Sequence, residues 1–448
     1  MPVEQPLPNT KGLLIAAPSS GAGKTTVTLA LLRALKNAGQ SVVSAKSGPD
    51  YIDPKFHEAA SGRPCINLDA WAMEVRSLQA LAKGHVSGHD LLIVEGAMGL
   101  FDGAASGVGS AADLAKSLNV PVILVVDCAK QAQSVAALVS GFQTFRSDIS
   151  VRGVILNRVG SARHEQMLRK ALAGLDIKVL GALPRTEKLV LPERHLGLVQ
   201  AVEHPELEAF LETAADICFK NVDLAAVKDL AGDIDLDQKS SSVQLPTPLG
   251  QRIAVAEDVA FAFSYLHLLD HWRRSGAEIS FFSPLADEGP ETGADAVYLP
   301  GGYPELHAGQ LANAQSFKSG MRSAANKGAL IYGECGGYMA LGDSLIDVGG
   351  QRHEMLGLLP LETSFQARKR HLGYRCLKPL AGVPWDTPLS AHEFHYASIV
   401  REGDADRLFA AKDAEGQDLA DMGLRAGNVM GSFAHIIALG PVNQYRRS

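Results

Sequence analysis

The sequence predicts an α/β protein that consists of two doubly wound α/β domains. Short apolar segments alternate with helical patterns along most of the chain, which is typical of a mostly parallel sheet covered by helices. The alternation stops in a polar stretch near the middle of the chain and then starts again. A length of 448 residues suits two α/β domains of ordinary size.

The first half contains a series of strand-length apolar runs, each separated from the next by a helical pattern. These runs are residues 12–17, 41–45, 91–94, 120–126, 151–156 and 181–184. They are apolar on both faces, as strands buried inside a parallel sheet are. A helix is expected over residues 25–38, where Gly39 stops it.

The middle of the chain predicts a linker. Residues 229–250 are polar, contain a serine run and two prolines, and show no apolar periodicity. The alternation restarts with an expected strand at 252–256, a helix at 265–275 and a strand at 278–282, followed by strands around Tyr298 and Ile331. We therefore predict an N-terminal domain over residues 1–235, a linker over 236–250 and a C-terminal domain over 251–448.

Composition excludes several classes of protein. The 42 basic and 49 acidic residues give a formal charge of −7, without the basic stripe that a nucleic-acid partner requires. The five cysteines show no CxxC spacing, so neither a zinc ribbon nor a disulfide framework is indicated. The N-terminus lacks the features of a secretion signal, and the longest apolar runs have only strand length. We expect a cytoplasmic protein with no membrane partner.

A phosphate-binding loop is predicted at the first strand-to-helix junction, over residues 17–26. Gly21 and Gly23 free the backbone, so that successive N–H groups can face phosphate oxygens. Lys24 supplies a positive charge, and the Thr25 hydroxyl can hold Mg²⁺. Pro18 replaces the first glycine of the strict motif. The alternative is a glycine-rich turn with an incidental lysine.

Polar residues follow other predicted strands of the first half. Glu95 ends the 91–94 run, in the manner of a metal-binding carboxylate, and Lys46, Asp50 and Asp53 cluster after the second strand. Acids at the carboxyl ends of parallel strands face the ligand crevice, although each one alone could instead cap a turn. Asn157 ends a later strand, where its amide could contact an adenine ring.

A candidate nucleophile, Cys335, stands in the second half. An apolar run breaks on Gly-Glu-Cys-Gly-Gly and restarts as a helix, which is how a chain exposes a nucleophile at the end of a strand. A thiol nucleophile needs a base, and His435 is the first candidate, with His392 or His395 as a second. The alternatives are a buried, inert thiol and hydrogen-bonded structural histidines.

The same chemistry needs hydrogen-bond donors for a charged intermediate. The backbone N–H of Gly336, directly after the cysteine, is one candidate, and a second comes from the turn that contains Gly302. These two groups form the predicted oxyanion hole. A phosphate loop and a thiol nucleophile on one chain imply chemistry that neither half could perform alone.

Several segments resemble known families. Those that resemble a class I, triad-type glutamine amidotransferase domain are residues 299–305, 332–337 and 431–435. Those that look like the dethiobiotin-synthetase-like ATP domain are residues 18–26, 46–54 and 95–103. The two halves in this order, with the segments 48–54 and 392–396, resemble the cobyrinic acid and hydrogenobyrinic acid a,c-diamide synthase family over nearly the whole chain. This resemblance implies a P-loop NTPase-like N-terminal domain and a flavodoxin-like C-terminal domain.

The resemblance also implies a reaction, an ATP-dependent amidation in cobalamin biosynthesis. The N-terminal domain would use ATP and Mg²⁺ to convert the a and c acetate carboxylates of a corrinoid into acyl phosphates. Cys335 would release ammonia from glutamine through a thioester, and the ammonia would displace the phosphate. The implied partners are small molecules (a corrinoid acid, L-glutamine and ATP), and the implied assembly is a homodimer.

By the same resemblance, individual residues receive roles. The ATP-binding residues are Gly21, Gly23, Lys24, Thr25, Thr26 and Asn157. The metal-binding residues are Thr25, Asp50 and Glu95. The residues that orient the substrate are Tyr51, Asp53 and Asp102.

One departure and two alternatives remain. Many triad-type relatives carry a glutamate two residues beyond the catalytic histidine, where this chain has Ile437. Either another residue orients His435 or the site works as a Cys–His dyad. The substrate could be cobalt-free, cobalt-containing or another tetrapyrrole acid, such as a nickel sirohydrochlorin. A regulatory ParA- or Mrp-like ATPase with an inactive glutaminase-like module is the alternative from another class, which an intact Cys335 disfavours.

Overall fold

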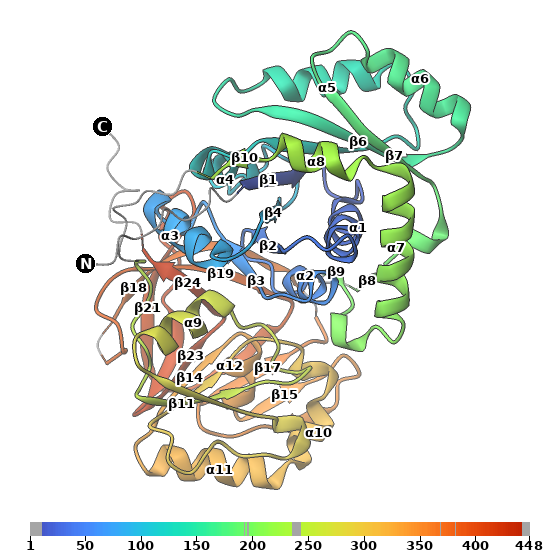
Figure 1. The fold of residues 1–448 in the computed structure, drawn as a ribbon. Helices are drawn as coiled ribbons and strands as arrows, with labels where there is room; N and C mark the ends of the chain where they lie inside the picture. The colour runs from blue at the N-terminus through green and yellow to red at the C-terminus, as the bar shows by residue number, and fades with distance from the viewer. Residues whose placement is uncertain are drawn as a thin grey trace, which may run out of the picture. The chain divides into compact units, whose positions relative to one another are not determined.

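The computed structural model describes residues 11–191, 193–194, 197–234, 243–367, 369–380 and 382–440. The chain divides into two compact units, residues 1–243 and 244–448, called here the N-terminal and C-terminal units. The colour in Figure 1 runs from blue to green through the first and from yellow to red through the second. The division falls inside the predicted linker, of which residues 236–242 lie outside the described residues.

The N-terminal unit is built on a parallel sheet in the order β3-β2-β4-β1-β5-β6-β7. Its strands are β1 (Lys11–Ala16), β2 (Val42–Ser47), β3 (Cys65–Leu68), β4 (Leu91–Glu95), β5 (Val122–Asp127), β6 (Val151–Val159) and β7 (Lys178–Pro184), with β10 (Gly232–Asp233) antiparallel to β1. A separate pair consists of β8 (Glu193–Arg194) and β9 (Gly197–Leu198). Every apolar run predicted as a strand in the first half lies on this sheet, whereas β3 was not predicted.

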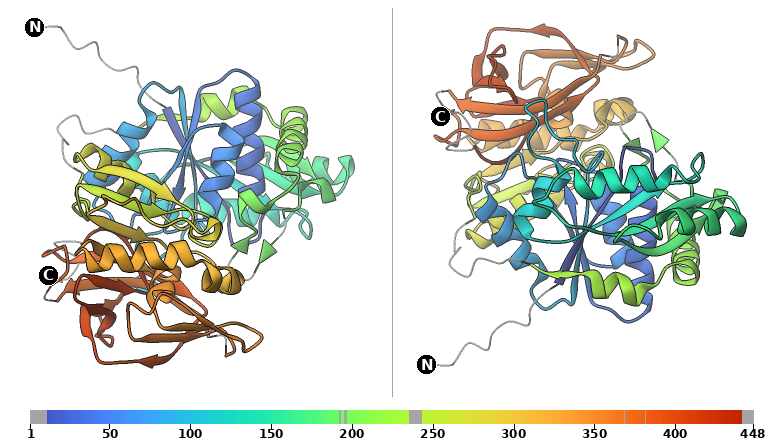
Figure 2. Two further views of the ribbon diagram at one scale, coloured as in Figure 1. Left: turned by 90° about the horizontal axis from the view of Figure 1, so that it is seen from below. Right: turned by 90° about the horizontal axis from the view of Figure 1, so that it is seen from above.

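Helices cover both faces of this sheet, as an α/β unit requires. They are α1 (Lys24–Asn37), α2 (Asp53–Ser61), α3 (Val75–Val86), α4 (Ala111–Leu118), α5 (Val135–Thr144), α6 (Ala162–Leu172), α7 (Leu207–Asn221) and α8 (Leu224–Leu230), with the 3-10 turns η1 (Glu187–Leu189) and η2 (Ala201–Glu203). Figure 1 shows α1 and α7 on one side of the central strands and α3 and α4 on the other. The views in Figure 2 keep α1 and α7 side by side, and Arg33 of α1 pairs with Glu208 and Glu212 of α7 at 2.8 and 2.6 Å.

The C-terminal unit has a mixed sheet in the order β12-β11-β13-β14-β23-β22-β21-β18-β19-β24. Its strands are β11 (Arg252–Ala256), β12 (Glu278–Phe282), β13 (Ala296–Leu299), β14 (Leu330–Glu334), β18 (His371–Pro379), β19 (Leu389–His395), β21 (Asp406–Asp413), β22 (Met422–Ala426), β23 (Val429–Ser432) and β24 (Ala434–Leu439). From β12 to β23 the pairing is parallel, in the flavodoxin-like order 2-1-3-4-5, and beyond β23 it is antiparallel. The sequence analysis did not predict the antiparallel part.

Smaller elements complete this unit. A second sheet contains β15 (Ser344–Ile346), β16 (Arg352–Glu354), β17 (Leu361–Ser364) and β20 (Ser398–Glu402). The helices are α9 (Leu266–Arg274), α10 (Ala308–Asn313), α11 (Gln315–Asn326) and α12 (Gly336–Leu341), with the 3-10 turns η3 (Pro284–Ala286) and η4 (Pro304–Leu306). Across the ranges described above, no helix combines the length and the apolar character that crossing a bilayer requires.

The end of the predicted linker is packed against the C-terminal unit. Leu245 and Leu249 are buried. The indole N–H of Trp272 donates to the Pro246 carbonyl, and that of Trp385 donates to the Thr247 carbonyl, both at 3.1 Å. Two buried apolar side chains and two carbonyls therefore tie residues 245–249 to the unit that follows.

The turn from β14 to α12 depends on a close approach of two backbones. A Cβ atom added to Gly337 would lie 1.9 Å from the carbonyl oxygen of Leu299, on the neighbouring strand β13. No L side chain can be accommodated at that distance without moving the helix away from the sheet. Glycine at this position therefore allows α12 to start directly behind the strand end.

We predict that Gly337→Ala lowers the free energy of unfolding of the C-terminal unit by ~3 kcal/mol, because the added methyl group overlaps a backbone carbonyl. Urea unfolding followed by tryptophan fluorescence measures this change. Gly309→Ala in α10 is the matched control, since the nearest atoms to its new Cβ are those of His353 at 3.7 Å. Equal unfolding free energies for both variants and the parent would contradict the packing argument.

Candidate functional site

The loop between β1 and α1 is shaped by two glycines and held by the end of β6. Gly21 and Gly23 have φ angles of 78° and 85°, in the left-handed region that favours glycine. A Cβ on Gly23 would also lie 2.3 Å from the side-chain nitrogen of Asn157. Asn157 donates to the Ala22 carbonyl and Arg158 to the Gly21 carbonyl, both at 2.9 Å. These contacts and the two glycines fix the shape of the loop.

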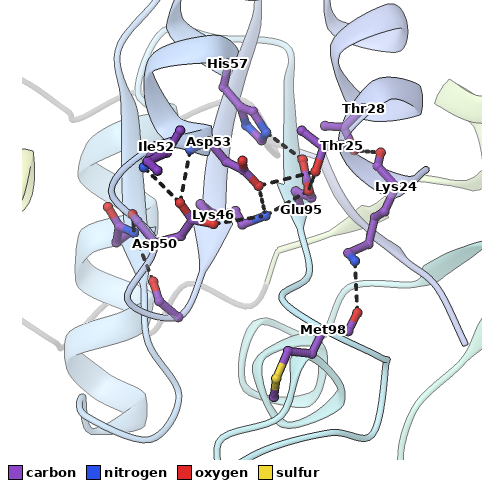
Figure 3. A network of polar contacts seen from close by, with 12 residues as sticks. Lys24, Thr25, Thr28, Lys46, Asp50, Ile52, Asp53, His57, Glu95 and Met98 are labelled. Carbon is purple, nitrogen blue, oxygen red and sulfur yellow. Dashed lines mark hydrogen bonds and ion pairs between the residues drawn. The ribbon is translucent and has the colours of Figure 1, made fainter. Parts of the chain in front are cut away.

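Carboxylates gather beside this loop at the ends of β2 and β4 (Figure 3). In the parallel register Lys46 of β2 lies opposite Glu95 of β4, and its Nζ is 2.8 Å from Glu95 Oε1. The same ammonium group donates to Asp53 and lies 3.8 Å from Asp50. The Thr25 hydroxyl donates to Glu95 at 2.7 Å and lies 3.3 Å from Asp53 Oδ2. The structure thus brings the predicted metal-binding residues together around one lysine.

His57 is a member of this cluster that the sequence analysis missed. It follows Asp53 by four residues on α2, so both side chains lie on one helix face. His57 Nε2 is 2.7 Å from Glu95 Oε2, and both side chains are fully buried. The i, i+4 spacing of Asp53 and His57 could have indicated that the two side chains lie on one face of a helix. Only the fold shows that this face lies next to Glu95.

Burial and charge set the protonation of the cluster. Burial favours a protonated Glu95, but Lys46 and His57 outweigh it and hold the pKa of Glu95 well below its usual value. Burial likewise opposes a charged imidazole, yet Cys65 and Glu95 raise the pKa of His57 to about 10. Burial and the neighbouring Asp50 raise the pKa of Asp53 to about 6. Glu95 is therefore a permanent anion between two cations.

A cavity of about 1140 Å³ opens onto the loop and onto Lys46, Asp50 and Asp53 of the cluster, whereas Glu95 and His57 are not among its described lining residues. Its described lining includes predicted residues of the loop and of the cluster: Gly21, Gly23, Lys24, Thr25, Thr26, Asp50, Asp53 and Asn157. Lys24 donates to the Met98 carbonyl at 2.9 Å, and burial lowers its pKa. The volume suits a ligand of nucleotide size.

Two of the predicted substrate residues lie apart from this lining. Asp102 is exposed and accepts a hydrogen bond from the Gly99 backbone at 3.0 Å, so it closes its own turn. Tyr51 is half-buried just before α2. Neither is among the described residues that line the cavity, whereas Asp53 is.

The donor set beside the loop fits Mg²⁺. Thr25 offers a hydroxyl, and Asp50, Asp53 and Glu95 offer carboxylates, which are the hard oxygen ligands that this ion prefers. Lys46 touches the same oxygens and compensates their charge. These residues could hold a magnesium ion next to the terminal phosphates of a nucleotide.

A second cluster with metal-ligand chemistry lies in the C-terminal unit. The donor atoms of His371, Glu393 and His395 lie within 4.8 Å of one another. Arg375, however, donates to Glu393 through two nitrogens at 2.7 and 2.8 Å. This cluster is thus an ion-paired network of one carboxylate, one guanidinium group and two imidazole rings.

Cys335 occupies the strained turn that the sequence analysis expected. It lies between β14 and α12 with φ 47° and ψ −102°, a conformation that costs a non-glycine residue free energy and is common at functional sites. Its backbone N–H donates to the Ser432 carbonyl at 2.8 Å, and its Sγ lies 3.8 Å from the Phe394 carbonyl. The elbow is thereby tied to the end of β23 and to β19.

The side chains of His435 and Cys335 both lie next to Gly301. A Cβ built on Gly301 would lie 2.3 Å from His435 Cε1, 3.1 Å from its Nε2 and 3.2 Å from Cys335 Cβ. Both side chains therefore border the same point, which only glycine leaves open. A Cβ on Gly336 would be 2.9 Å from the Gly302 nitrogen, so the two predicted oxyanion donors are also neighbours.

Of the other two candidate bases, His395 is engaged elsewhere and His392 is a cross-strand neighbour of His435. His395 contacts Glu393 through Nε2 at 2.9 Å and the Ala397 carbonyl through Nδ1 at 3.0 Å. His392 lies opposite His435 in the β19–β24 register. Of the described histidines, His435 is the one that the Gly301 geometry brings to the thiol.

Both members of the pair are neutral at rest. Burial raises the pKa of the Cys335 thiol far above its usual value. Burial, reinforced by His392 and His395, lowers the pKa of His435 to about 3. The thiolate must therefore form during the reaction, when a proton moves to the imidazole.

The position two residues beyond His435 offers no acid. Ile437 is fully buried and belongs to the apolar core. The carboxylate found near the ring is that of Glu334, whose Oε2 is 3.7 Å from His435 Nδ1. No role was predicted for Glu334 from the sequence. An acid in an apolar strand, directly before the nucleophile, was the feature that could have indicated one.

Both units match family models. Residues 13–199 match the CobQ/CobB/MinD/ParA nucleotide binding domain. Residues 252–442 match the CobB/CobQ-like glutamine amidotransferase domain. These descriptions agree with the phosphate loop in the first unit and the thiol elbow in the second.

Curated relatives match over nearly the full length. A protein of Brucella abortus is 61% identical over 95% of this chain and 98% of its own. One of Rhizobium meliloti is 58% identical over 95% and 99%, and one of Rhodobacter capsulatus is 51% identical over 96% and 99%. All three are named hydrogenobyrinate a,c-diamide synthase. The chain belongs to the hydrogenobyrinate a,c-diamide synthase family.

Proposed function

We propose that the chain amidates the a and c acetate carboxylates of hydrogenobyrinic acid, with ATP as energy source and glutamine as nitrogen donor, in cobalamin biosynthesis. The observation that carries this proposal is the presence of two built sites on one chain. One is a phosphate loop with its acid cluster, and the other is a thiol with its base. The names of the relatives support the cobalt-free acid as substrate.

The N-terminal unit would activate the carboxylate. A substrate carboxylate oxygen attacks the terminal phosphorus of ATP, the O–P bond forms, and ADP leaves. Gly21, Gly23 and Thr26 bind phosphate oxygens, Lys24 compensates their charge, and Asn157 supports the loop on the adenosine side. Thr25, Asp50 and Glu95 would hold Mg²⁺, which would compensate the negative charge of the phosphates.

Three further residues would orient the corrinoid. Asp53 lies inside the cavity beside Lys46, and we propose that it positions the reacting carboxylate. Tyr51 and Asp102 lie outside the described lining and would contact the periphery of the macrocycle. The acyl phosphate is then protected from water for as long as the substrate stays bound.

The C-terminal unit would supply ammonia. His435 takes the proton of the Cys335 thiol, and the sulfur attacks the side-chain amide carbon of glutamine. The N–H groups of Gly302 and Gly336 stabilise the oxyanion. His435 returns the proton to the leaving ammonia, and water hydrolyses the thioester to glutamate. The ammonia displaces phosphate from the acyl phosphate, once for each carboxylate.

The setting of this activity is also a proposal. All substrates are small soluble molecules, and the acidic balance of the chain disfavours a nucleic-acid partner. We propose a cytoplasmic enzyme. A homodimer is proposed on the family resemblance alone.

We predict that the purified chain converts hydrogenobyrinic acid to its diamide when ATP, Mg²⁺ and glutamine are present, and consumes two ATP per product. Mass spectrometry of the products measures this. Cobyrinic acid, offered side by side, should react more slowly. Preferred conversion of the cobalt-containing acid would contradict the substrate assignment, and no amidation of any tetrapyrrole acid would contradict the function.

We predict that Cys335→Ala lowers glutamine-dependent amidation at least ~10³-fold, because the nucleophile is lost. Amidation with ammonium chloride should continue, since the thiol is not needed for free ammonia. Cys376→Ala is the matched control, because Cys376 is another cysteine of the same unit. Unchanged glutamine-dependent activity in Cys335→Ala would refute the thiol mechanism.

A further inference from the structure

Glu334 is held in one orientation at the end of β14. Its Oε1 accepts the backbone N–H of Ile436 at 3.0 Å, and its Oε2 accepts the hydroxyl of Tyr298 at 2.7 Å. The side chain is 2% exposed. A long side chain fixed at both oxygens cannot rotate away, so its position relative to neighbouring groups is well determined.

The same carboxylate faces the ring of His435. Its Oε2 is 3.7 Å from Nδ1, and the ring is 1% exposed. The opposite edge of the ring, Cε1 and Nε2, borders the point beside Gly301 that Cys335 also borders. The imidazole therefore stands between the nucleophile and a buried acid.

We propose that Glu334 is the positioning residue of the glutaminase site, taking the place of the acid that is absent at Ile437. Its carboxylate holds His435 with Nε2 toward the thiol. When Nε2 accepts the thiol proton, the Nδ1–H faces an anion and the imidazolium is stabilised. This proposal rests on the proposed glutaminase activity and assigns it a further residue.

The distance of 3.7 Å between Glu334 Oε2 and His435 Nδ1 is longer than that of a hydrogen bond, but close enough for the carboxylate to stabilise a charge on the ring. Catalytic hydrogen bonds are often long in free enzymes and shorten when the substrate binds. The Ile436 N–H bond ties the carboxylate to the residue after His435, so both groups move together.

The other acid near the His435 ring, Glu393, already has partners at both of its oxygens. Glu393 of β19 binds Arg375 through one oxygen at 2.8 Å and His395 through the other at 2.9 Å. Both of its oxygens thus serve a separate network. The hydrogen-bond partners of Glu334, in contrast, are neutral groups, the hydroxyls of Tyr298 and Tyr332 and the backbone N–H of Ile436, so its carboxylate can still stabilise a positive charge on His435.

The surroundings predict a pH dependence. Burial raises the pKa of Glu334 to about 7, against the lowering effect of the bonds from Ile436, Tyr298 and Tyr332. The groups that face His435 are Glu334, the Cys335 thiol, and His392, Glu393 and His395 of β19. Only the ionised carboxylate can stabilise the imidazolium. Glutamine hydrolysis should therefore increase as the pH rises through about 7.

The first test is Glu334→Gln, which keeps the length of the side chain and an acceptor for the Ile436 N–H but removes the charge. We expect kcat/KM for glutamine hydrolysis to decrease about 100-fold, as for lost support of a general base. The increase through pH 7 should disappear. Amidation with ammonium chloride, which bypasses the thiol site, reports that the variant is folded.

Glu362→Gln is the matched control, since Glu362 is a partly buried acid of the same unit that accepts a hydrogen bond from Ser344 at 2.8 Å. It should hydrolyse glutamine at the parent rate. A Glu334→Gln variant within threefold of the parent would overturn the inference, because a merely structural acceptor role survives in glutamine. A parent chain without any glutaminase activity would instead overturn the proposed function.

Tyr298→Phe tests the same idea if Glu334→Gln does not fold. The variant removes the hydroxyl that lowers the pKa of Glu334, so the carboxylate should ionise at higher pH. The pH midpoint of glutamine hydrolysis should shift upward, with the plateau rate largely retained. A midpoint that does not move would also overturn the inference.

Discussion

A carboxylate buried at the carboxyl end of a parallel strand is the constraint on which both units depend. Glu95 ends β4 and Glu334 ends β14, and each is almost inaccessible to water. A buried anion is costly unless hydrogen bonds or cations compensate it. In the N-terminal unit Lys46 and His57 compensate, so Glu95 stays ionised. In the C-terminal unit neutral hydrogen-bond donors offset only part of the cost of burying the charge of Glu334, so its pKa is raised to about 7.

This difference in protonation suits two kinds of chemistry. A permanent anion beside a phosphate loop can hold a divalent ion, whatever the pH of the cell. An acid that titrates near pH 7 can instead respond to a charge that appears on a neighbouring histidine during a reaction. A buried carboxylate at the end of a parallel strand would thus have a static role in one unit and a responsive role in the other.

The sequence predicted the parallel strands because they are apolar on both faces, and it predicted the phosphate loop and the elbow because both need glycines at defined places. The sequence did not predict the features that depend on contacts between residues far apart in the chain. The antiparallel strands β18 to β24 were missed, since half-exposed strands such as β18 lack a clear apolar pattern. His57 and Glu334 were missed as site residues for a related reason. Their partners, Glu95 and His435, are 38 and 101 residues away, and only the fold shows that they meet.

The central claim is that the N-terminal unit activates a carboxylate by phosphorylation before ammonia arrives. To test this, hydrogenobyrinic acid labelled with ¹⁸O in its carboxylates is incubated with the protein, ATP and glutamine. The inorganic phosphate that is released is then analysed by mass spectrometry. We expect one ¹⁸O atom to be transferred to phosphate for each amide formed, because the carboxylate oxygen leaves with the phosphoryl group. Amide formation with unlabelled phosphate would contradict it.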